Sequence, residues 1–323
     1  MSRFLHKLNR RLLVRYRLEY AVAVILIYTV RALSPDMAWR AARRLGRFTF
    51  RLGLRRSTIM SNLRIAFPDM SEKERREIGF RTWEHFLSLA VDIILQRRML
   101  QSSNVLEKIR ITGWGGDFIR EHGADALAKQ IHGCVFCGGH FGNWELATGM
   151  FKLLGVTIVP IFRAPSNPFI AELVRKVRLD SQSKLLERRG AVQGMIDTLK
   201  AGGNVGFLFD QEASSGMMVP LFGVEAPTHK TPAILFRDVK APLFFGSMIR
   251  RGDYFNYEAR GELLTDPPYT EDRYEDVKSI LIDLNQRLEA RVREHPEQYF
   301  WMHRRWKNLG IHAPRAKKKD VSE

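Results

Sequence analysis

His140 is the residue whose setting best suits proton-transfer chemistry. It follows an apolar, strand-like run at 134–137 and two glycines, Gly138 and Gly139. Glu145 comes five residues later, where a helical pattern begins. A histidine at a strand end with a carboxylate nearby suits general acid–base catalysis. We therefore predict that His140 is a general base and that Glu145 orients its ring.

The spacing of the histidine and the glutamate is not specific by itself. With nine histidines and 35 acidic residues in 323, roughly one pair at this spacing is expected by chance. Neighbouring strand ends must therefore supply the supporting evidence.

Two other predicted strands end in polar residues. Arg163 leaves a strand into a turn bracketed by prolines, and Asp210 and Gln211 follow the apolar run 207–209. In sheets of this kind, sites gather at the carboxyl ends of strands. Each residue alone has a structural alternative, Arg163 as a surface charge and Asp210 as a turn residue or helix cap. Three such ends in one sheet favour a shared site.

From about residue 108 the pattern alternates between strand and helix, which predicts a mixed α/β sheet flanked by helices. The expected strands are 108–112, 134–137, 157–162, 204–209, 243–249 and 254–260. The expected helices are 117–130, 145–154, 168–179, 191–200, 232–238 and 274–294. Before this region, Ser71 and Glu74 form a capping box that opens a helix reaching about residue 97.

The N-terminal region is strongly basic and contains a short apolar segment. Of the formal net charge of +17, residues 1–64 carry +13, and the uninterrupted apolar run at 20–30 is 11 residues long. A bilayer span needs about 20 residues. A helix over 8–33 with basic ends is therefore expected to lie in or dip into an anionic leaflet on the cytoplasmic side. The alternative is an ordinary buried helix of a soluble protein.

A second basic helix is expected over 37–54. Nucleic-acid binding is not favoured, because the aromatic residues fall at helical core spacing and no binding signature is present. We expect basic membrane-associating helices at 1–60, a catalytic domain at 61–309 and a basic polar tail at 310–323.

The two cysteines, Cys134 and Cys137, form a C-x-x-C pair. This spacing would place the two thiols on opposite faces of a strand, and the chain has no second Cys/His pair at metal spacing. We therefore expect buried, reduced thiols and no metal site. A serine hydrolase is not favoured either, because the chain lacks a G-x-S-x-G elbow.

The segment 139–145, Gly-His-Phe-Gly-Asn-Trp-Glu, resembles the first motif of the late lipid A acyltransferases. These membrane-associated enzymes add secondary acyl chains to lipid IVA. They belong to the wider lysophospholipid/glycerolipid acyltransferase superfamily, whose signature is His-x4-Asp/Glu. Four further segments resemble the same subfamily, namely 62–68, 162–168, 209–223 and 296–307. One departure is Glu212, which follows Gln211 where many members have aspartate.

The resemblance implies a glycerolipid acyltransferase-like fold and an acyl transfer that needs no cofactor and no covalent intermediate. It implies that His140 and Glu145 are catalytic and that Arg163 holds a phosphate or the oxyanion. Asp210, Gln211 and Asn143 are expected in the substrate-binding wall. Three further basic residues are expected to bind anionic groups, with solvated surface charges as the alternative: Lys230, Arg304 and Arg305.

The implied partners are acyl carrier protein as the donor, a lipid A precursor as the acceptor and an anionic membrane surface. The implied location is the cytoplasmic face of a bacterial inner membrane. Coenzyme A remains open as the donor. The alternative functions are acyl transfer to another membrane lipid, such as a lysophospholipid or glycolipid, and a non-catalytic protein of the membrane surface.

Overall fold

The computed structural model describes residues 10–162, 164–181, 185–187, 190–211, 213, 215–252 and 254–307. Its centre is a seven-stranded sheet in the order β1-β9-β8-β2-β5-β3-β4. The strands of this sheet are β1 (Ile109–Gly113), β2 (Val135–Gly138), β3 (Ile158–Phe162), β4 (Leu186–Glu187), β5 (Asn204–Leu208), β8 (Leu243–Arg250) and β9 (Tyr257–Leu264). The predicted mixed α/β architecture is confirmed.

The register of the sheet brings distant strand ends together. β8 and β9 pair antiparallel, and the other neighbours pair parallel. Gly138, the last residue of β2, lies opposite Leu208, the last residue of β5. Because the two strands run in the same direction, the loops that follow them leave from the same edge of the sheet.

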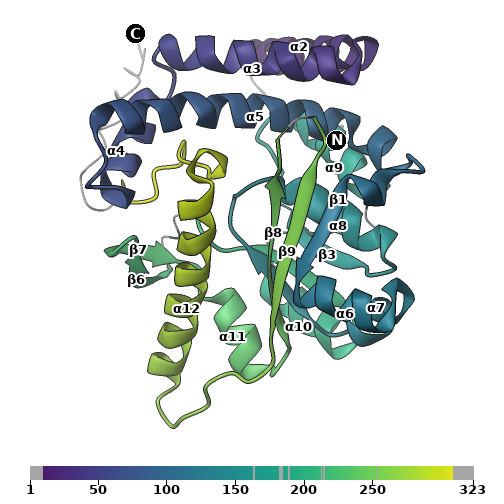
Figure 1. Ribbon diagram of the computed structural model, residues 1–323, viewed down its shortest axis with the longest axis vertical. Coiled ribbons are helices and arrows are strands. Elements are labelled where there is room, and N and C mark those ends of the chain that lie inside the picture. The colour runs from purple at the N-terminus through teal and green to yellow at the C-terminus, as the bar shows by residue number, and fades with distance from the viewer. Residues whose placement is uncertain are drawn as a thin grey trace.

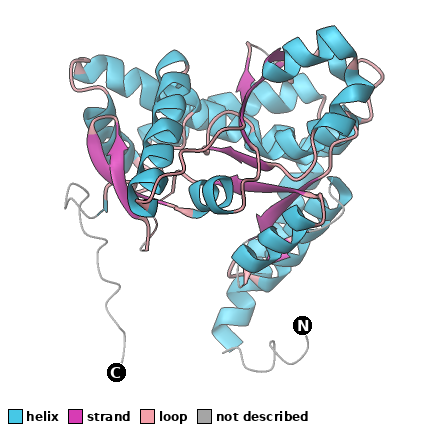
Figure 2. Cartoon of the chain, turned by 90° about the horizontal axis from the view of Figure 1, so that it is seen from below, coloured by secondary structure: helices cyan, strands magenta, loops and turns pink. Residues whose placement is uncertain are grey.

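Helices cover both faces of the sheet (Figures 1 and 2). Those on one face include α5 (Glu72–Leu100), α7 (Ala124–Gln130) and α8 (Trp144–Leu153), and those on the other include α4 (Arg56–Ala66), α10 (Ala191–Lys200), α11 (Thr231–Asp238) and α12 (Arg273–Glu294). Cys134 packs on the face covered by α5, α7 and α8, and Cys137 packs on the opposite face. Both thiols are buried and free. The prediction of buried thiols on opposite faces is confirmed.

The long helix α5 is the main support of the N-terminal half. It begins at the predicted capping box, in which the Ser71 side chain accepts from the Glu74 backbone and the Glu74 carboxylate accepts from the Ser71 backbone. Two further helices, α2 (Arg10–Ala32) and α3 (Pro35–Arg51), lie on the far side of α5 from the sheet (Figure 1). Glu84 of α5 forms ion pairs with Arg43 and Arg47 of α3.

The predicted N-terminal helix over 8–33 is confirmed as α2 from its first described residue, and the helix over 37–54 corresponds to α3. Among the residues with described structure, none of the helices combines the length and apolarity needed to cross a membrane. The expected tail at 310–323 lies outside the described residues. The division of the chain at residue 60, which falls within α4, stays a prediction.

Two differences from the expected elements concern a helix and a hairpin. The helix expected over 117–130 is two helices, α6 (Trp114–His122) and α7, which break at Gly123 with φ 84°. The strands β6 (Met217–Leu221) and β7 (Val224–Thr228) form an antiparallel hairpin that was not predicted. Its turn contains Phe222 and Gly223, both with positive φ, which matches the left-handed turn that tight hairpins need.

Candidate active site

His140 lies two residues beyond β2 and contacts Asp210, which lies two residues beyond β5. Its Nδ1 is 2.7 Å from Asp210 Oδ1, and its backbone N–H donates to Asp210 Oδ2 at 2.9 Å. Both carboxylate oxygens therefore hold one residue. The contact follows from the register, because Gly138 and Leu208 are paired across the two parallel strands.

The second ring nitrogen of His140 faces Gln211. The Gln211 amide nitrogen lies 3.0 Å from His140 Nε2. With Nδ1–H donated to the carboxylate, Nε2 is left as the acceptor of the neutral ring. The sequence predicted Asp210 and Gln211 only as wall residues, whereas the structure places both directly on the histidine.

Glu145 does not make the contact predicted for it. Its carboxylate pairs with Arg178 of α9 (Pro168–Ser181), and the Nδ1 contact that would fix the tautomer is made by Asp210. The physical reason is that Glu145 lies in the first turn of α8, which directs it toward α9. The predicted His140–Glu145 pairing is therefore wrong, although both residues line the same cavity.

Arg178 is a site residue that the sequence analysis missed. Its guanidinium lies over the Phe162 ring at the end of β3, 5.7 Å from the ring centroid, and lines the cavity with His140 and Glu145. It sits within a helix, where no strand-end signal marks it. Arg163, which was expected to supply the positive charge near this strand end, lies outside the described residues.

Asp210 is almost fully buried, with 2% of its side chain exposed against 18% for His140. Burial raises the pKa of Asp210, but electrostatic attraction to the His140 ring and the hydrogen bonds from His140 outweigh burial, and Arg305 adds to their effect, so the net pKa is lowered. Burial and the nearby charge of Asp210 raise the pKa of Tyr299. The carboxylate is therefore held in its ionised form beside the ring.

Arg305 has a structural role that differs from the predicted one. It is 2% exposed, and its guanidinium donates to the Pro227 carbonyl and, at 2.6 Å, to Thr228 Oγ1. A residue buried in this way braces β7 and cannot meet a substrate directly. Arg304 is half-buried and does not line the cavity.

Asn143 is likewise not brought to the cavity. It is 1% exposed and caps α8, its Oδ1 accepting from the Leu146 N–H at 3.1 Å. Lys230 is exposed at the predicted start of α11, and its chain neighbours His229 and Thr231 both line the cavity. Its expected role at an anionic group stays a prediction.

The C-terminal segment 299–306 closes the site from one side. The Phe300 N–H donates to the His140 carbonyl at 3.0 Å, and the rings of Phe300 and Trp144 lie 6.1 and 5.1 Å from the His140 ring. Asn62 of α4 fixes this segment by donating to the carbonyls of Trp301 and His303, both at 2.7 Å. Of the segments that carried the family resemblance, 296–307 thus contacts the histidine directly, and 62–68 holds 296–307 in place.

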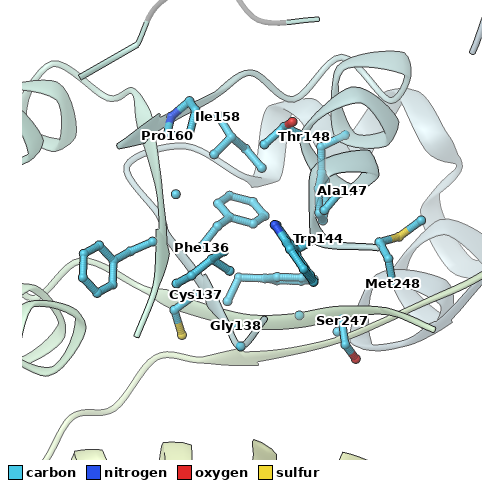
Figure 3. Close-up of a pocket in the computed structure, with 18 of the residues that line it drawn as sticks. Phe136, Cys137, Gly138, Trp144, Ala147, Thr148, Ile158, Pro160, Ser247 and Met248 are labelled. Carbon is cyan, nitrogen blue, oxygen red and sulfur yellow. The ribbon is translucent and has the colours of Figure 1, made fainter. Parts of the chain in front are cut away.

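A cavity of about 700 Å³ adjoins His140. Figure 3 shows Phe136, Ala147 and Ile158 among the side chains around it, from β2, α8 and β3. Most of the other lining side chains are also apolar, including Leu127, Ile131, Met150, Phe151 and Leu154. Of the polar lining residues, Gln211 contacts the histidine, Glu145 pairs with Arg178, and others, including Arg260, His229 and Ser247, lie elsewhere in the lining.

A histidine whose Nδ1 contacts a buried carboxylate presents Nε2 as the group that can accept a proton. An apolar cavity beside it provides room for a hydrocarbon chain. This combination suits an enzyme that moves acyl chains.

Comparison with known proteins gives the family. The model of the bacterial lipid A biosynthesis acyltransferases matches residues 5–308, and the chain belongs to this family. It is 28% identical over 297 residues to the lipid A biosynthesis lauroyltransferase of Escherichia coli (strain K12), covering 91% of this chain and 92% of the relative. It is 27% identical over 268 residues to the lipid A biosynthesis palmitoleoyltransferase of the same organism, covering 80% of each. The predicted family and acyltransferase activity are confirmed.

Proposed function

We propose that this enzyme transfers an acyl chain from an acyl carrier protein thioester to a hydroxyl of a lipid A precursor of the lipid IVA type. The observation that carries the proposal is the His140–Asp210 pair beside the apolar cavity. The names of the relatives support the acceptor class, since both act in lipid A biosynthesis.

In the proposed reaction His140 acts as the general base. Nε2 takes the proton of the acceptor hydroxyl while its oxygen attacks the thioester carbonyl carbon. The tetrahedral intermediate then collapses, the carbon–sulfur bond breaks, and the imidazolium returns the proton to the leaving thiolate. Asp210 holds Nδ1–H throughout and stabilises the imidazolium. Gln211 must release Nε2 when the hydroxyl binds, because both need the same lone pair.

We assign Arg178 to the negative charge that develops on the thioester oxygen. It lines the cavity with His140, and its ion pair with Glu145 fixes the guanidinium there. A positive group held in a site that excludes water stabilises an oxyanion more strongly than it would in water. Glu145 would then act through Arg178 and not through the histidine.

The apolar part of the cavity is the proposed site of the donor acyl chain. Burying each methylene group of such a chain contributes about 0.8 kcal/mol. Binding energy from the chain would then hold the thioester carbonyl beside His140 Nε2, which lowers the entropic cost of the reaction.

The positive charge of the protein supports an acidic donor and an anionic acceptor. The formal net charge is +17, and Lys230 lies exposed beside two cavity-lining residues. Positive surface raises the encounter rate with acidic partners such as acyl carrier protein or a phosphorylated lipid.

We also propose that α2 and α3 bind the cytoplasmic face of the inner membrane. Apolar side chains of α2 are exposed by half or more, including Leu18 at 62%, Ile25 at 65% and Tyr28 at 68%. Leu45 and Phe48 of α3 are exposed at 52% and 55% among the arginines of that helix. Apolar residues interspersed with arginine suit an anionic leaflet.

The acceptor is tested by offering two lipids to the purified protein with an acyl carrier protein thioester. We expect acylation of a tetra-acylated lipid A precursor, with little acylation of lysophosphatidate. Mass spectrometry of both lipids from the same reaction reports the preference. Acylation of lysophosphatidate alone would refute the proposed acceptor and favour another membrane lipid. A parallel reaction with the coenzyme A thioester tests the donor.

A further inference from the structure

The turn that carries His140 is held by a buried hydrogen-bonded chain behind the active site. Asn143, three residues after His140, caps α8 through Oδ1 and donates through Nδ2 to the hydroxyl of Tyr257 at 3.0 Å. Tyr257 lies on β9 and is 0% exposed. Neither Asn143 nor Tyr257 lines the cavity. These hydrogen bonds therefore act on the site only through the turn.

The Tyr257 hydroxyl is committed on its other side. It donates its one proton to Asp92 of α5, which also accepts from Arg250 of β8. The hydroxyl can therefore only accept from Asn143. If the Asn143 amide were reversed, its oxygen would face the Tyr257 hydroxyl oxygen, whose proton is already donated to Asp92. The cap of α8 would then be lost as well. Tyr257 thereby fixes which way the Asn143 side chain points.

The backbone of the turn is held at adjacent points. Asn143 N–H donates to the Met248 carbonyl at 2.8 Å, and Gly142 N–H donates to the Gln298 carbonyl at 3.0 Å. His85 Nε2 lies 3.2 Å from the Gly142 carbonyl. With these backbone groups fixed, the side-chain bond from Asn143 to Tyr257 ties the start of α8 to β9.

We propose that Tyr257 is a positioning residue for acyl transfer, acting through Asn143 on the turn that presents His140. The inference rests on the proposed function of His140 as the base. A general base must lie within hydrogen-bond reach of the proton that it takes, and a displacement of about 1 Å at a reacting group can cost about a hundredfold in rate.

The test compares Tyr257→Phe with Tyr254→Phe. Each substitution removes one hydroxyl close to Asp92, but the Tyr254 hydroxyl has no hydrogen-bond partner in the described part of the chain. We expect Tyr257→Phe to lower kcat roughly tenfold, equivalent to about 1.4 kcal/mol, with KM for donor and acceptor unchanged. Tyr254→Phe should keep the wild-type kcat. Equal kcat values for the two variants would overturn the inference.

A double-mutant cycle tests the route through Asn143. Asn143→Ser keeps a side chain that caps helices but removes the amide that reaches Tyr257. If Tyr257 acts through Asn143, the double variant should lose no more kcat than the more impaired single variant. Additive losses would mean that Tyr257 acts by another route, and the inference would fail.

Hydrogen exchange separates this inference from the proposed function, because it needs no turnover. We expect faster exchange in the peptide that contains the start of α8, Trp144 to Leu146, in Tyr257→Phe and not in Tyr254→Phe. If exchange is faster in Tyr257→Phe but the wild type transfers no acyl chain, the proposed function is refuted while the contact between Tyr257 and Asn143 stands. Unchanged exchange would refute the contact itself.

Discussion

Both oxygens of the Asp210 carboxylate contact His140. One of its oxygens receives the ring Nδ1–H and the other receives the backbone N–H of the same residue. This double contact fixes both the tautomer and the position of the imidazole, leaving Nε2 for the substrate. The roles of the two nearby acids therefore differ: Asp210 serves the base, and Glu145 serves Arg178.

Substitutions at the two acids should separate these roles. Asp210→Asn should lower kcat by about four orders of magnitude, as the equivalent change does in a serine-protease triad, because the amide no longer enforces the reactive tautomer. Glu145→Gln should lower kcat by about a hundredfold at most, because it only weakens the contact that fixes the Arg178 guanidinium near the oxyanion. Steady-state kinetics of both variants measures the difference. A larger loss for Glu145→Gln would return the orienting role to that residue.

His85 should make the protein sensitive to acid. Burial lowers the pKa of His85 from 6.5 to about 3, so the folded protein keeps this ring neutral while the unfolded chain protonates it below pH 6.5. Its contribution to stability is complete above pH 6.5 and is lost as the pH falls toward 3. At pH 5 the loss is about 2 kcal/mol.

His85→Gln should remove this loss. Urea unfolding at pH 7.5 and pH 5 gives the pH dependence of the unfolding free energy for the wild type and the variant. The wild type should lose more stability between the two pH values than the variant does. An identical loss in both proteins would show that His85 is not the group responsible.

At the scale of the elements, the strands that build the site were predictable, but their order was not. Apolar runs placed β2, β5 and β3 correctly, and the residues after them were recognised as candidates. The pairing of β2 with β5 depends on contacts between segments 70 residues apart, which no local pattern records. A prediction from sequence therefore favours Glu145, the acid nearer in sequence, over Asp210 as the partner that orients His140.

Other omissions have similar local causes. The hairpin β6–β7 contains prolines at 220 and 227, which weaken a strand signal. Arg178 lies inside an amphipathic helix, where an arginine ordinarily faces solvent. Its role became visible only when α9 was placed against Glu145.

Gly142 is the glycine on which the His140 turn depends. It has φ +61°, and an added Cβ would lie 1.9 Å from the Met248 carbonyl oxygen. Gly142→Ala should therefore destabilise the protein by several kcal/mol more than Gly223→Ala, which has φ +74° and nothing within 4 Å of an added Cβ. In the control, Gly223→Ala, only the positive φ is unfavourable, which costs about 1–2 kcal/mol.

Urea unfolding of both glycine variants measures this difference. If Gly142→Ala fails to fold while Gly223→Ala folds normally, the expectation is also met. Equal stability of the two variants would mean that the turn does not press against β8 as described.

At the scale of the whole molecule, one layer of the fold combines positive charge with exposed apolar side chains. The helices α2 and α3 lie over α5, away from the sheet (Figure 1). Through Glu84 and His85, α5 connects this layer on one side and the His140 turn on the other. The proposed membrane surface and the site thus share one supporting helix.

Removing apolar side chains from this layer should weaken membrane binding. Leu18→Ser with Ile25→Ser should lower affinity for anionic vesicles at least roughly tenfold, since burying one such side chain contributes about 1.5–3 kcal/mol. The matched control is Leu106→Ser with Leu153→Ser, which are exposed at 52% and 43% outside α2 and α3. Vesicle co-sedimentation measures both. Equal binding by the two variants would place the membrane contact elsewhere.

The most direct test of the account is acyl transfer by the purified protein and its His140→Ala variant. The wild type, given an acyl carrier protein thioester and a tetra-acylated lipid A precursor, should yield a lipid heavier by one acyl group and an equal amount of free thiol, both quantified by mass spectrometry. His140→Ala should yield neither product above the uncatalysed background. Transfer by His140→Ala at the wild-type rate would contradict the assignment of His140 as the base.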